Sequence, residues 1–463
     1  MGSRECRACG VVSGANSFSS KDIGLNGRNL HVRRPRALTV RAQAIEGKKL
    51  VDVVISGAGP AGLAAALALS KTGWKDIVLL EENKRDGNSG TALGLWTNAW
   101  KALDALGVGD DIRQSGAPMV DKVEVCREDG DRVLRSFGLD ECANGPHEFR
   151  GVTRKTLMDC LETHLPPEVV IKYEKRVADC KIGDQGATVT TSDGDQLICN
   201  LLIGADGVRS NVAMALGKKS QRDLSVNYVG QIAIRGVASY SDGVPCYSIR
   251  QIWGPSTRAG VYPVSNNEMY WYVCFDDDGS GRSIMDGQDV LEEAQKMLVS
   301  ASSKTWQRSV VWDAIQQTSS HRVSRSRLAD RWDLSSLLPS ANSLGNVPVA
   351  LVGDALHPMT PNLGQGGCTA LEDGVVLARL LRQSGALGVP VGRSRQPLIT
   401  AALQKYNLAR AKRCVPLVVR SNLMGHALQT GLWPVVAARD TYVSAFFNPS
   451  HFLDHAAFDC GTL

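Results

Sequence analysis

The chain has 463 residues, of which 43% are hydrophobic and 21% charged, and its formal net charge is +5. These proportions are typical of a soluble globular protein, and no charge-free apolar run of about 18 residues predicts a membrane-spanning helix. Residues 1–45 hold eight Arg or Lys against two acidic residues, a net +6, so the rest of the chain carries −1. A nearly neutral body excludes the basic face that nucleic-acid binding requires.

The first 45 residues have the composition of an organellar transit peptide: they are rich in Arg and Ser, poor in acids, and lack an apolar secretory core. The junction at residues 40–42 is similar to a plastid processing site, which predicts a chloroplast protein. A disordered leader of a cytoplasmic protein is the alternative, and mitochondrial import is also open. The twelve Cys residues are scattered without the paired spacing of a zinc site, so we expect reduced thiols and no metal.

A first glycine loop, residues 57–62 (Gly-Ala-Gly-Pro-Ala-Gly), follows the apolar strand predicted at 51–56 and precedes a helix of small residues. This strand, loop and helix form the context in which a glycine fingerprint binds a dinucleotide. Gly57 allows the tight turn, Gly59 lets the backbone approach a pyrophosphate, and Gly62 permits close helix packing. The free N–H groups at the helix N-terminus favour an anion there.

A second predicted strand, residues 76–80, ends at Glu81 and Glu82. One of these carboxylates should accept hydrogen bonds from an adenosine ribose. Glu81 is the preferred candidate because it leaves the strand first, and Glu82 is the alternative. Both side chains solvating the strand end is the other interpretation.

Two further glycine-rich segments follow predicted strands. The strand at 197–203 runs into Gly204-Ala-Asp-Gly207, where Asp206 is either a ligand-side acid or merely the cap of a turn. The strand at 347–354 leads into a second glycine loop, residues 353–367, which is followed by a helix. The apolar face of this helix predicts that it is buried on one side, with Glu372 and Asp373 pointing away from that side. Together the segments predict a cradle for one extended ligand, FAD, with amide N–H groups of the second loop stabilising negative charge on a reduced ring.

Four motifs carry a resemblance to a known family: GAGPAG at 57–62, GVTRKTL at 151–157, GADGVRS at 204–210 and GDALHPMTPNLGQGG at 353–367. In this order and spacing the chain resembles the FAD-dependent aromatic hydroxylase superfamily, the single-component flavoprotein monooxygenases, over residues 50–460. It looks most like plant monooxygenases related to zeaxanthin epoxidase and to salicylate-hydroxylase-like proteins. The sequence ends without the C-terminal phosphopeptide-binding-type domain of zeaxanthin epoxidases, so we do not transfer their carotenoid substrate.

The resemblance implies a set of FAD contacts. Glu81, or Glu82, would bind the ribose, Arg154 the diphosphate and ribityl chain, and Val177 the adenine through its backbone, although core packing is the expected role of the Val177 side chain. Asp206 would border both flavin and NAD(P)H, and Asp354 would bind ribityl or phosphate groups. The pyrophosphate would be contacted by Gly57, Ala58, Gly59 and Gly62. The isoalloxazine ring would be contacted by Pro361, Gly364, Gly366 and Gly367.

The expected fold is mixed α/β, with a Rossmann-like FAD-binding domain at 46–220 and 340–385 and an inserted antiparallel-sheet substrate domain at 221–339. A helical segment would follow at 386–463. Alternating polar and apolar residues support antiparallel strands in the inserted part. Aromatic and basic residues there are candidates for the substrate pocket, with core packing or a structural ion pair as the alternative: Arg235, Trp253, Tyr262, Tyr270 and Tyr272.

No residue is assigned a catalytic role. His357 precedes a proline in the second glycine loop, but a structural role is expected for it. His426, His451 and His455 lie among aromatic residues near the C-terminus, where a packing tail is a better interpretation than a metal site.

The resemblance implies a monooxygenase that uses NAD(P)H and O2 to hydroxylate or epoxidise a small aromatic or isoprenoid substrate through a flavin C4a-hydroperoxide. Two alternatives stay open. One is an FAD-dependent reductase of the prenyl-reductase type with the same fold, and the other is a flavin-binding regulatory protein without turnover. The sequence does not choose between NADH and NADPH and does not assign an oligomeric state.

Overall fold

The computed structural model describes residues 44–45, 48–85, 91–128, 132–183, 186–220, 223–277, 279, 286–302, 306–332, 346–390 and 394–463. Residues 1–43 of the predicted leader and the predicted boundaries at 221 and 340 lie outside these ranges. The described residues belong to one compact unit.

The first sheet has the strand order β8-β3-β2-β11-β10-β9, with β1 and β17 joined at its side. The strands β8, β3, β2, β11 and β17 run parallel, whereas β10 and β9 are antiparallel additions. Its strands are β1 (Ala44–Ile45), β2 (Lys48–Ser56), β3 (Ile77–Leu80), β8 (Val170–Lys172), β9 (Val177–Gly183), β10 (Gly186–Thr191), β11 (Gln196–Gly204) and β17 (Val349–Leu351). A parallel core of β-branched strands is what the apolar runs predict.

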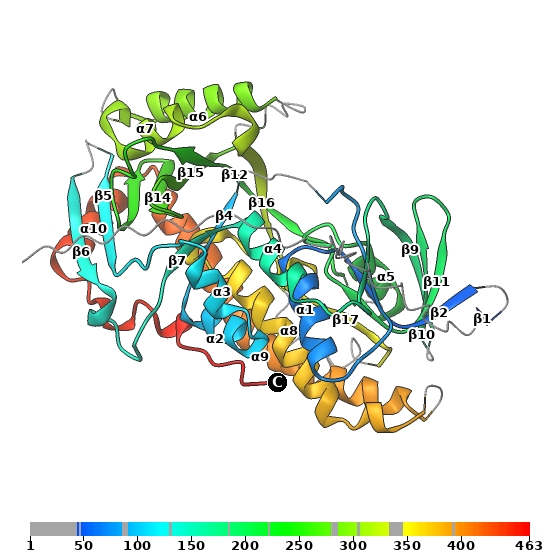
Figure 1. The fold of residues 1–463 in the computed structure, drawn as a ribbon. Coiled ribbons are helices and arrows are strands. Elements are labelled where there is room, and N and C mark those ends of the chain that lie inside the picture. The colour runs from blue at the N-terminus through cyan, green and yellow to red at the C-terminus, as the bar shows by residue number, and fades with distance from the viewer. Residues whose placement is uncertain are drawn as a thin grey trace, which may run out of the picture. The chain divides into compact units, whose positions relative to one another are not determined.

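Helix α1 (Pro60–Lys71) packs on helix α8 (Gly366–Gln383), and both lie against this sheet (Figure 1). The crossing is close because Gly374 has no side chain: a Cβ there would lie 2.8 Å from the carbonyl carbon of Ala64. The small residues of α1 are therefore needed at this crossing as well as against the sheet. Around the pair pack α2 (Thr97–Leu106), α3 (Gly109–Gln114) and α4 (Arg154–Thr163), while α5 (Asn211–Ser220) packs against β9.

The second sheet has the order β16-β12-β15-β14-β13-β5-β6 and is antiparallel except where β13 pairs with β5. Its strands are β5 (Lys122–Arg127), β6 (Val133–Gly138), β12 (Asn227–Ser239), β13 (Ile249–Gly254), β14 (Thr257–Pro263), β15 (Glu268–Asp276) and β16 (Val323–Asp330). Helices α6 (Gly287–Ser302) and α7 (Val310–Gln316) cover one face (Figure 1). Strands β5 and β6 come from within the predicted FAD-binding segment 46–220, so this sheet takes strands from both sides of that boundary.

A short two-stranded sheet, β4 (Ala92–Leu95) with β7 (Arg150–Thr153), lies beside helix α8. Gly151 of this ribbon touches β14, since a Cβ there would lie 2.4 Å from the Pro263 carbonyl oxygen. The ribbon therefore connects the helices of the first sheet to the second sheet.

The C-terminal part is helical. Helix α9 (Gln396–Gln429) contains Pro416 in its interior and packs against α8 before reaching β13 and β14, and α10 (Trp433–Ala445) follows it. Within the described ranges, no helix combines the length and the apolar character needed to cross a membrane.

Candidate functional site

A cavity of about 510 Å³ lies between the two glycine loops and the second sheet. Its loop side is formed by residues from α1, α4, the end of β11 and the second glycine loop. Of the predicted FAD contacts, seven line it directly: Gly59, Arg154, Asp354, Pro361, Gly364, Gly366 and Gly367, the last two at the start of α8. Segments separated by about 300 residues in the chain thus meet at one site.

The first glycine loop is packed so tightly that side chains are excluded. A Cβ on Gly57, whose φ is +102°, would lie 2.5 Å from the Ala205 carbonyl oxygen, and one on Gly62 would lie 2.0 Å from the Gly57 carbonyl oxygen. Helix α1 begins after Gly59 without any capping side chain. Its first N–H groups have no partner within the helix, so they are available to an anion.

Glu81 lies beside this loop. Its Oε2 accepts a hydrogen bond from the Ala58 N–H at 2.9 Å, and its Oε1 accepts one from the Asn83 N–H at 3.0 Å. Glu82 is exposed and faces Arg176, with 3.6 Å between its Oε2 and the arginine Nε. Of the two predicted ribose partners, Glu81 is therefore the one next to the loop.

Arg154 begins α4 directly after Thr153, whose hydroxyl caps the helix by accepting the Thr156 N–H at 3.1 Å. The guanidinium reaches the first glycine loop, because a Cβ on Gly59 would lie 3.3 Å from Arg154 Nη2. Within the described part of the chain no carboxylate forms an ion pair with Arg154. The positively charged guanidinium of Arg154 therefore lies next to the uncapped start of α1.

Helix α8 also begins at the cavity without a capping side chain, after Gln365. The short 3₁₀ turns η6 (Gly353–Ala355) and η7 (Pro361–Leu363) shape the loop before it. Asp354 lines the cavity, and its surface is open to this space alone because protein surrounds the site. Desolvation by that surrounding protein raises the pKa of Asp354. Two helix N-termini therefore converge on one cavity.

The acidic residues of α8 are a correction to the sequence analysis, which predicted that Glu372 and Asp373 face away from the buried side. Both have 0% exposure. They pair with Arg410, at 2.9 Å from its Nη2 to a Glu372 oxygen and 2.5 Å from its Nε to an Asp373 oxygen. Glu372 also pairs with Arg413 at 2.9 Å, so the cations come from α9, which the helical periodicity of α8 alone does not reveal.

His357 belongs to the same buried network. Its Nε2 lies 2.8 Å from Asp373 Oδ2, which also accepts the Gly353 N–H at 2.6 Å. Burial alone would lower the pKa of His357, but the Asp373 carboxylate holds it well above its usual value. A positively charged imidazole tied to a carboxylate supports the structural role expected for this residue. Cys414 lies close enough to complete a group with metal-ligand spacing, but the Asp373 carboxylate is already shared by His357, Arg410 and the Gly353 N–H.

Two of the predicted FAD contacts, Asp206 and Val177, do not line the cavity. The Asp206 carboxylate accepts the backbone N–H groups of Asn211 at 2.9 Å and Val212 at 3.3 Å, together with the Ser210 hydroxyl, so it caps α5. Its neighbours Ala205 and Gly207 line the cavity, whereas its own side chain does not. Val177 is buried, and its carbonyl oxygen accepts the Asn211 side-chain amide at 2.7 Å. The capping alternative for Asp206 and the packing alternative for the Val177 side chain thus match the observed contacts.

The second sheet supplies the opposite wall of the cavity. Arg235 pairs with Tyr272, and Tyr262 with Tyr270, in the register of adjacent antiparallel strands, so these side chains share one face. All five candidates for the substrate pocket line the cavity: Arg235, Trp253, Tyr262, Tyr270 and Tyr272. The rings of Tyr262 and Tyr270 stack with centroids 4.7 Å apart. Burial raises the pKa of Tyr270 to about 12, which keeps this phenol neutral at physiological pH.

Further lining residues come from elements that no local pattern connects with the pocket: Trp96, Phe149, Arg250, Gln251, Arg258, Arg420, Met424, Leu428, Phe452 and His455. His455 is one of the three C-terminal histidines considered above, and its exposure is 8%. Burial and the nearby Arg420 and Arg413 lower its pKa to about 4, so it is neutral. His451 instead lies on the surface beside Asp454, and His426 lines a different hollow near β16. Only strand register and tertiary packing could have identified the further residues that line the main cavity.

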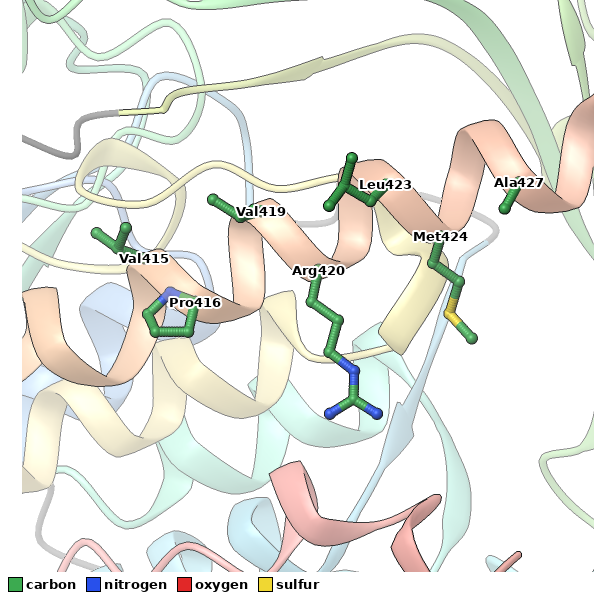
Figure 2. Close-up of a pocket in the computed structure, with 7 residues that line it drawn as sticks. All are labelled: Val415, Pro416, Val419, Arg420, Leu423, Met424 and Ala427. Carbon is green, nitrogen blue, oxygen red and sulfur yellow. The ribbon is translucent and has the colours of Figure 1, made fainter. Parts of the chain in front are cut away.

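A separate, open hollow follows the surface of α9 and is drawn in Figure 2. Apart from Arg420, its lining is apolar: Val415, Pro416, Val419, Leu423, Met424 and Ala427. The Arg420 side chain extends away from Val419 and Leu423 (Figure 2), and Arg420 and Met424 also line the main cavity. This stretch of α9 therefore separates the cavity from an apolar surface.

Two uncapped helix starts, a carboxylate beside the first loop and an aromatic wall thus meet around one cavity. A family model described as "FAD binding domain" matches residues 50–384, and the chain belongs to this family.

Similar proteins with known names agree with this family assignment. Monooxygenase 2 of Arabidopsis thaliana is 31% identical over 423 residues, covering 89% of this chain and 98% of its own. Aurachin C monooxygenase/isomerase of Stigmatella aurantiaca is 29% identical, covering 83% and 90%, respectively. The chloroplastic zeaxanthin epoxidase of Nicotiana plumbaginifolia is 28% identical over 79% of this chain but only 53% of its own. The predicted resemblance to FAD-dependent monooxygenases is confirmed, and the chain is an FAD-dependent oxidoreductase.

Solved structures confirm the mixed α/β fold. Klebsiella pneumoniae HpxO complexed with FAD and uric acid superposes with a TM-score of 0.72 at 22% identity, covering 89% of this chain and 96% of its own. At this identity the likeness shows the fold alone.

Proposed function

We propose that the chain is an NAD(P)H-dependent monooxygenase that transfers one oxygen atom from O2 to a small aromatic or isoprenoid substrate. The observation that carries the proposal is the cavity itself. One wall presents two uncapped helix N-termini, and the other presents neutral aromatic side chains of the second sheet. A cofactor and an apolar substrate would therefore meet in one enclosed space.

The described residues fit FAD. The start of α1 and Arg154 would hold the pyrophosphate, Glu81 the adenosine ribose, and Asp354 the ribityl chain. A Cβ at Gly59 would fill the approach between loop and guanidinium, which accounts for the glycine there. When bound, FAD supplies the redox and oxygen chemistry that the protein side chains cannot perform.

The protein's own contribution would be to orient, to exclude water and to stabilise charge. The N–H groups of Gly366 and Gly367 would donate to the pyrimidine edge of the ring and favour negative charge on it. Trp96, Phe149 and Tyr262 would exclude water from the reacting atoms. NAD(P)H would need to approach only transiently, since no second glycine fingerprint is present in the sequence.

Incubation of the purified chain with NADPH, candidate phenolic or isoprenoid compounds and ¹⁸O2 tests the proposal. We expect one compound to accelerate NADPH oxidation and to gain a single ¹⁸O atom, measured by mass spectrometry. A reduced alkene formed without oxygen would instead identify the prenyl-reductase alternative. Bound FAD with no compound-stimulated NADPH oxidation would favour the regulatory alternative.

We also propose that the protein acts in the chloroplast. The composition of residues 1–45 and the chloroplastic relative support this location. Residues 1–45 fused to a fluorescent protein should direct it into plastids of plant cells, and a cytosolic or mitochondrial signal would contradict the proposal.

A further inference from the structure

A group of three metal-ligand side chains lies outside the cavity, where helices α3 and α4 meet. Cys160 is in the last turn of α4 and His164 directly follows that helix, so the two side chains lie one turn apart on the same face. Asp111 comes from α3. The thiol sulfur, one ring nitrogen and one carboxylate oxygen all lie within 4.8 Å of one another. Three kinds of ligand atom from two helices are thus within reach of a single ion.

The imidazole of His164 is already oriented for an ion. Its Nδ1 donates to the Cys160 carbonyl oxygen at 2.8 Å, and its Nε2 lies 2.9 Å from Asp111 Oδ2. In metal-binding histidines, a hydrogen bond from one ring nitrogen to a backbone carbonyl fixes the ring and leaves the other nitrogen for the metal. Nε2 is therefore the nitrogen that an ion would take, on the side of the ring that faces the carboxylate.

The carboxylate of Asp111 is not neutralised by a permanent cation. Its neighbour Asp110 pairs with Arg113 at 3.0 Å. Asp111 instead faces His164, and within the described ranges no lysine or arginine forms an ion pair with it. The Asp111 side chain is 57% exposed, so water can reach this side of the group. The site would therefore have room for a solvent ligand beside the three protein ligands.

The thiol of Cys160 completes the group. Its Sγ lies 4.0 Å from His164 Nδ1 and 3.9 Å from the Val108 carbonyl oxygen. Burial and the Asp111 carboxylate raise the pKa of this thiol, so it is protonated without a metal, and an ion must displace that proton. A thiolate, an imidazole and a carboxylate are ligands of zinc, whereas magnesium and calcium prefer oxygen ligands. The chemistry of the ligands thus favours zinc.

We propose that Asp111, Cys160 and His164 form a zinc site, with water as the fourth ligand of a tetrahedral ion. Zinc would bind the thiolate, Nε2 and one carboxylate oxygen, and the displaced protons of the thiol and of a charged imidazole would pass to solvent. Cysteine spacing does not reveal this site, because it combines three residue types from two helices. The ion would join α3 to the end of α4, whose first residue, Arg154, lies beside the first glycine loop.

Protection of Cys160 from alkylation tests the site. Within the described part of the chain, Cys160 and Cys246 are the two free cysteines that are not buried, so Cys246 is an internal control. The full chain is treated with iodoacetamide with and without excess Zn²⁺, and mass spectrometry follows the labelling of each cysteine. We expect Zn²⁺ to slow labelling of Cys160 by about tenfold and of Cys246 by less than about twofold, because the bound thiolate is no longer free to react. Mg²⁺ should protect neither cysteine.

Two exposed acids of α3 provide matched variants that keep the thiol. Asp111→Asn should remove most of the protection of Cys160, whereas Asp110→Asn should retain it, since Asp110 pairs with Arg113. Rates with and without Zn²⁺ are compared within each variant, which cancels any change in the reactivity of the free thiol. Equal slowing at Cys160 and Cys246, no slowing at Cys160, or full protection in Asp111→Asn would overturn the inference. The readout involves no turnover, so the result does not depend on the proposed function.

Discussion

At the scale of single residues, the first glycine loop depends on two features. Its glycines leave no room for a side chain, and one carboxylate hydrogen-bonds the loop. Gly57 and Gly62 pack against backbone oxygens at distances that no Cβ tolerates. Glu81 and Glu82 are adjacent in sequence, but only Glu81 hydrogen-bonds the first glycine loop. Substitution of Glu82 is therefore a matched control for substitution of Glu81.

Glu81→Gln should weaken FAD binding by about tenfold, because a hydrogen bond to a charged acceptor contributes about 1.5–3 kcal/mol. The amide of Gln keeps only one acceptor oxygen, so it can accept from the Ala58 N–H or the Asn83 N–H but not from both, and it lacks the negative charge that would accept from the ribose. Glu82→Gln should leave the affinity within about twofold. Titration of the apoprotein with FAD, followed by flavin fluorescence, measures both, and equal effects of the two changes would contradict the assignment.

At the scale of elements, helices α8 and α9 are joined by buried ions. Glu372 and Asp373 of α8 have no exposed surface, and Arg410 of α9 contacts both. Asp373 in turn holds the Gly353 N–H and His357 at the start of the second glycine loop. Helix α9 thereby fixes the loop that would lie against the flavin, although α9 follows that loop in the chain.

Arg410→Met should destabilise the protein by about 3–5 kcal/mol, because it leaves two buried carboxylates short of a cation. Lys412→Met, at an exposed position of the same helix, should change stability by less than about 0.5 kcal/mol. Urea unfolding followed by circular dichroism compares the two variants. Equal midpoints would show that the buried ions do not join the helices.

The stability contributed by His357 should depend on pH with a definite sign. Its folded pKa is raised above the unfolded value, which is about 6.5, so the contribution is full below that value and is lost as the pH rises through the folded pKa. The difference in melting temperature between the wild type and His357→Gln should therefore shrink between pH 6 and pH 9. A difference that stays constant or grows over this range would contradict the charged imidazole.

At the scale of the whole molecule, local patterns were sufficient for one side of the site. A strand, a glycine loop and a helix follow one another at Gly57 and again before Gly366, so the sequence predicts both loops and their helices. The alternation of β12 to β15 predicted antiparallel strands, in which Arg235 and Tyr262 were candidates for the substrate pocket. These inferences need only neighbours along the chain or across one hairpin.

Other features depend on partners far away in the sequence and were not predictable from it. The pairing of β5 with β13 joins residues from the first third of the chain to the second sheet. The burial of Glu372 is set by arginines of α9, and the position of Arg258 in the cavity is set by strand register and by Gln429. No periodicity within a single helix or strand carries that information.

The central claim is that this cavity holds FAD, and the visible absorbance spectrum of the purified chain tests it most directly. The account predicts a yellow protein with flavin bands and, after removal of the flavin, uptake of one FAD per chain, with Glu81→Gln taking up less at limiting FAD. A colourless protein that takes up no FAD would contradict the account.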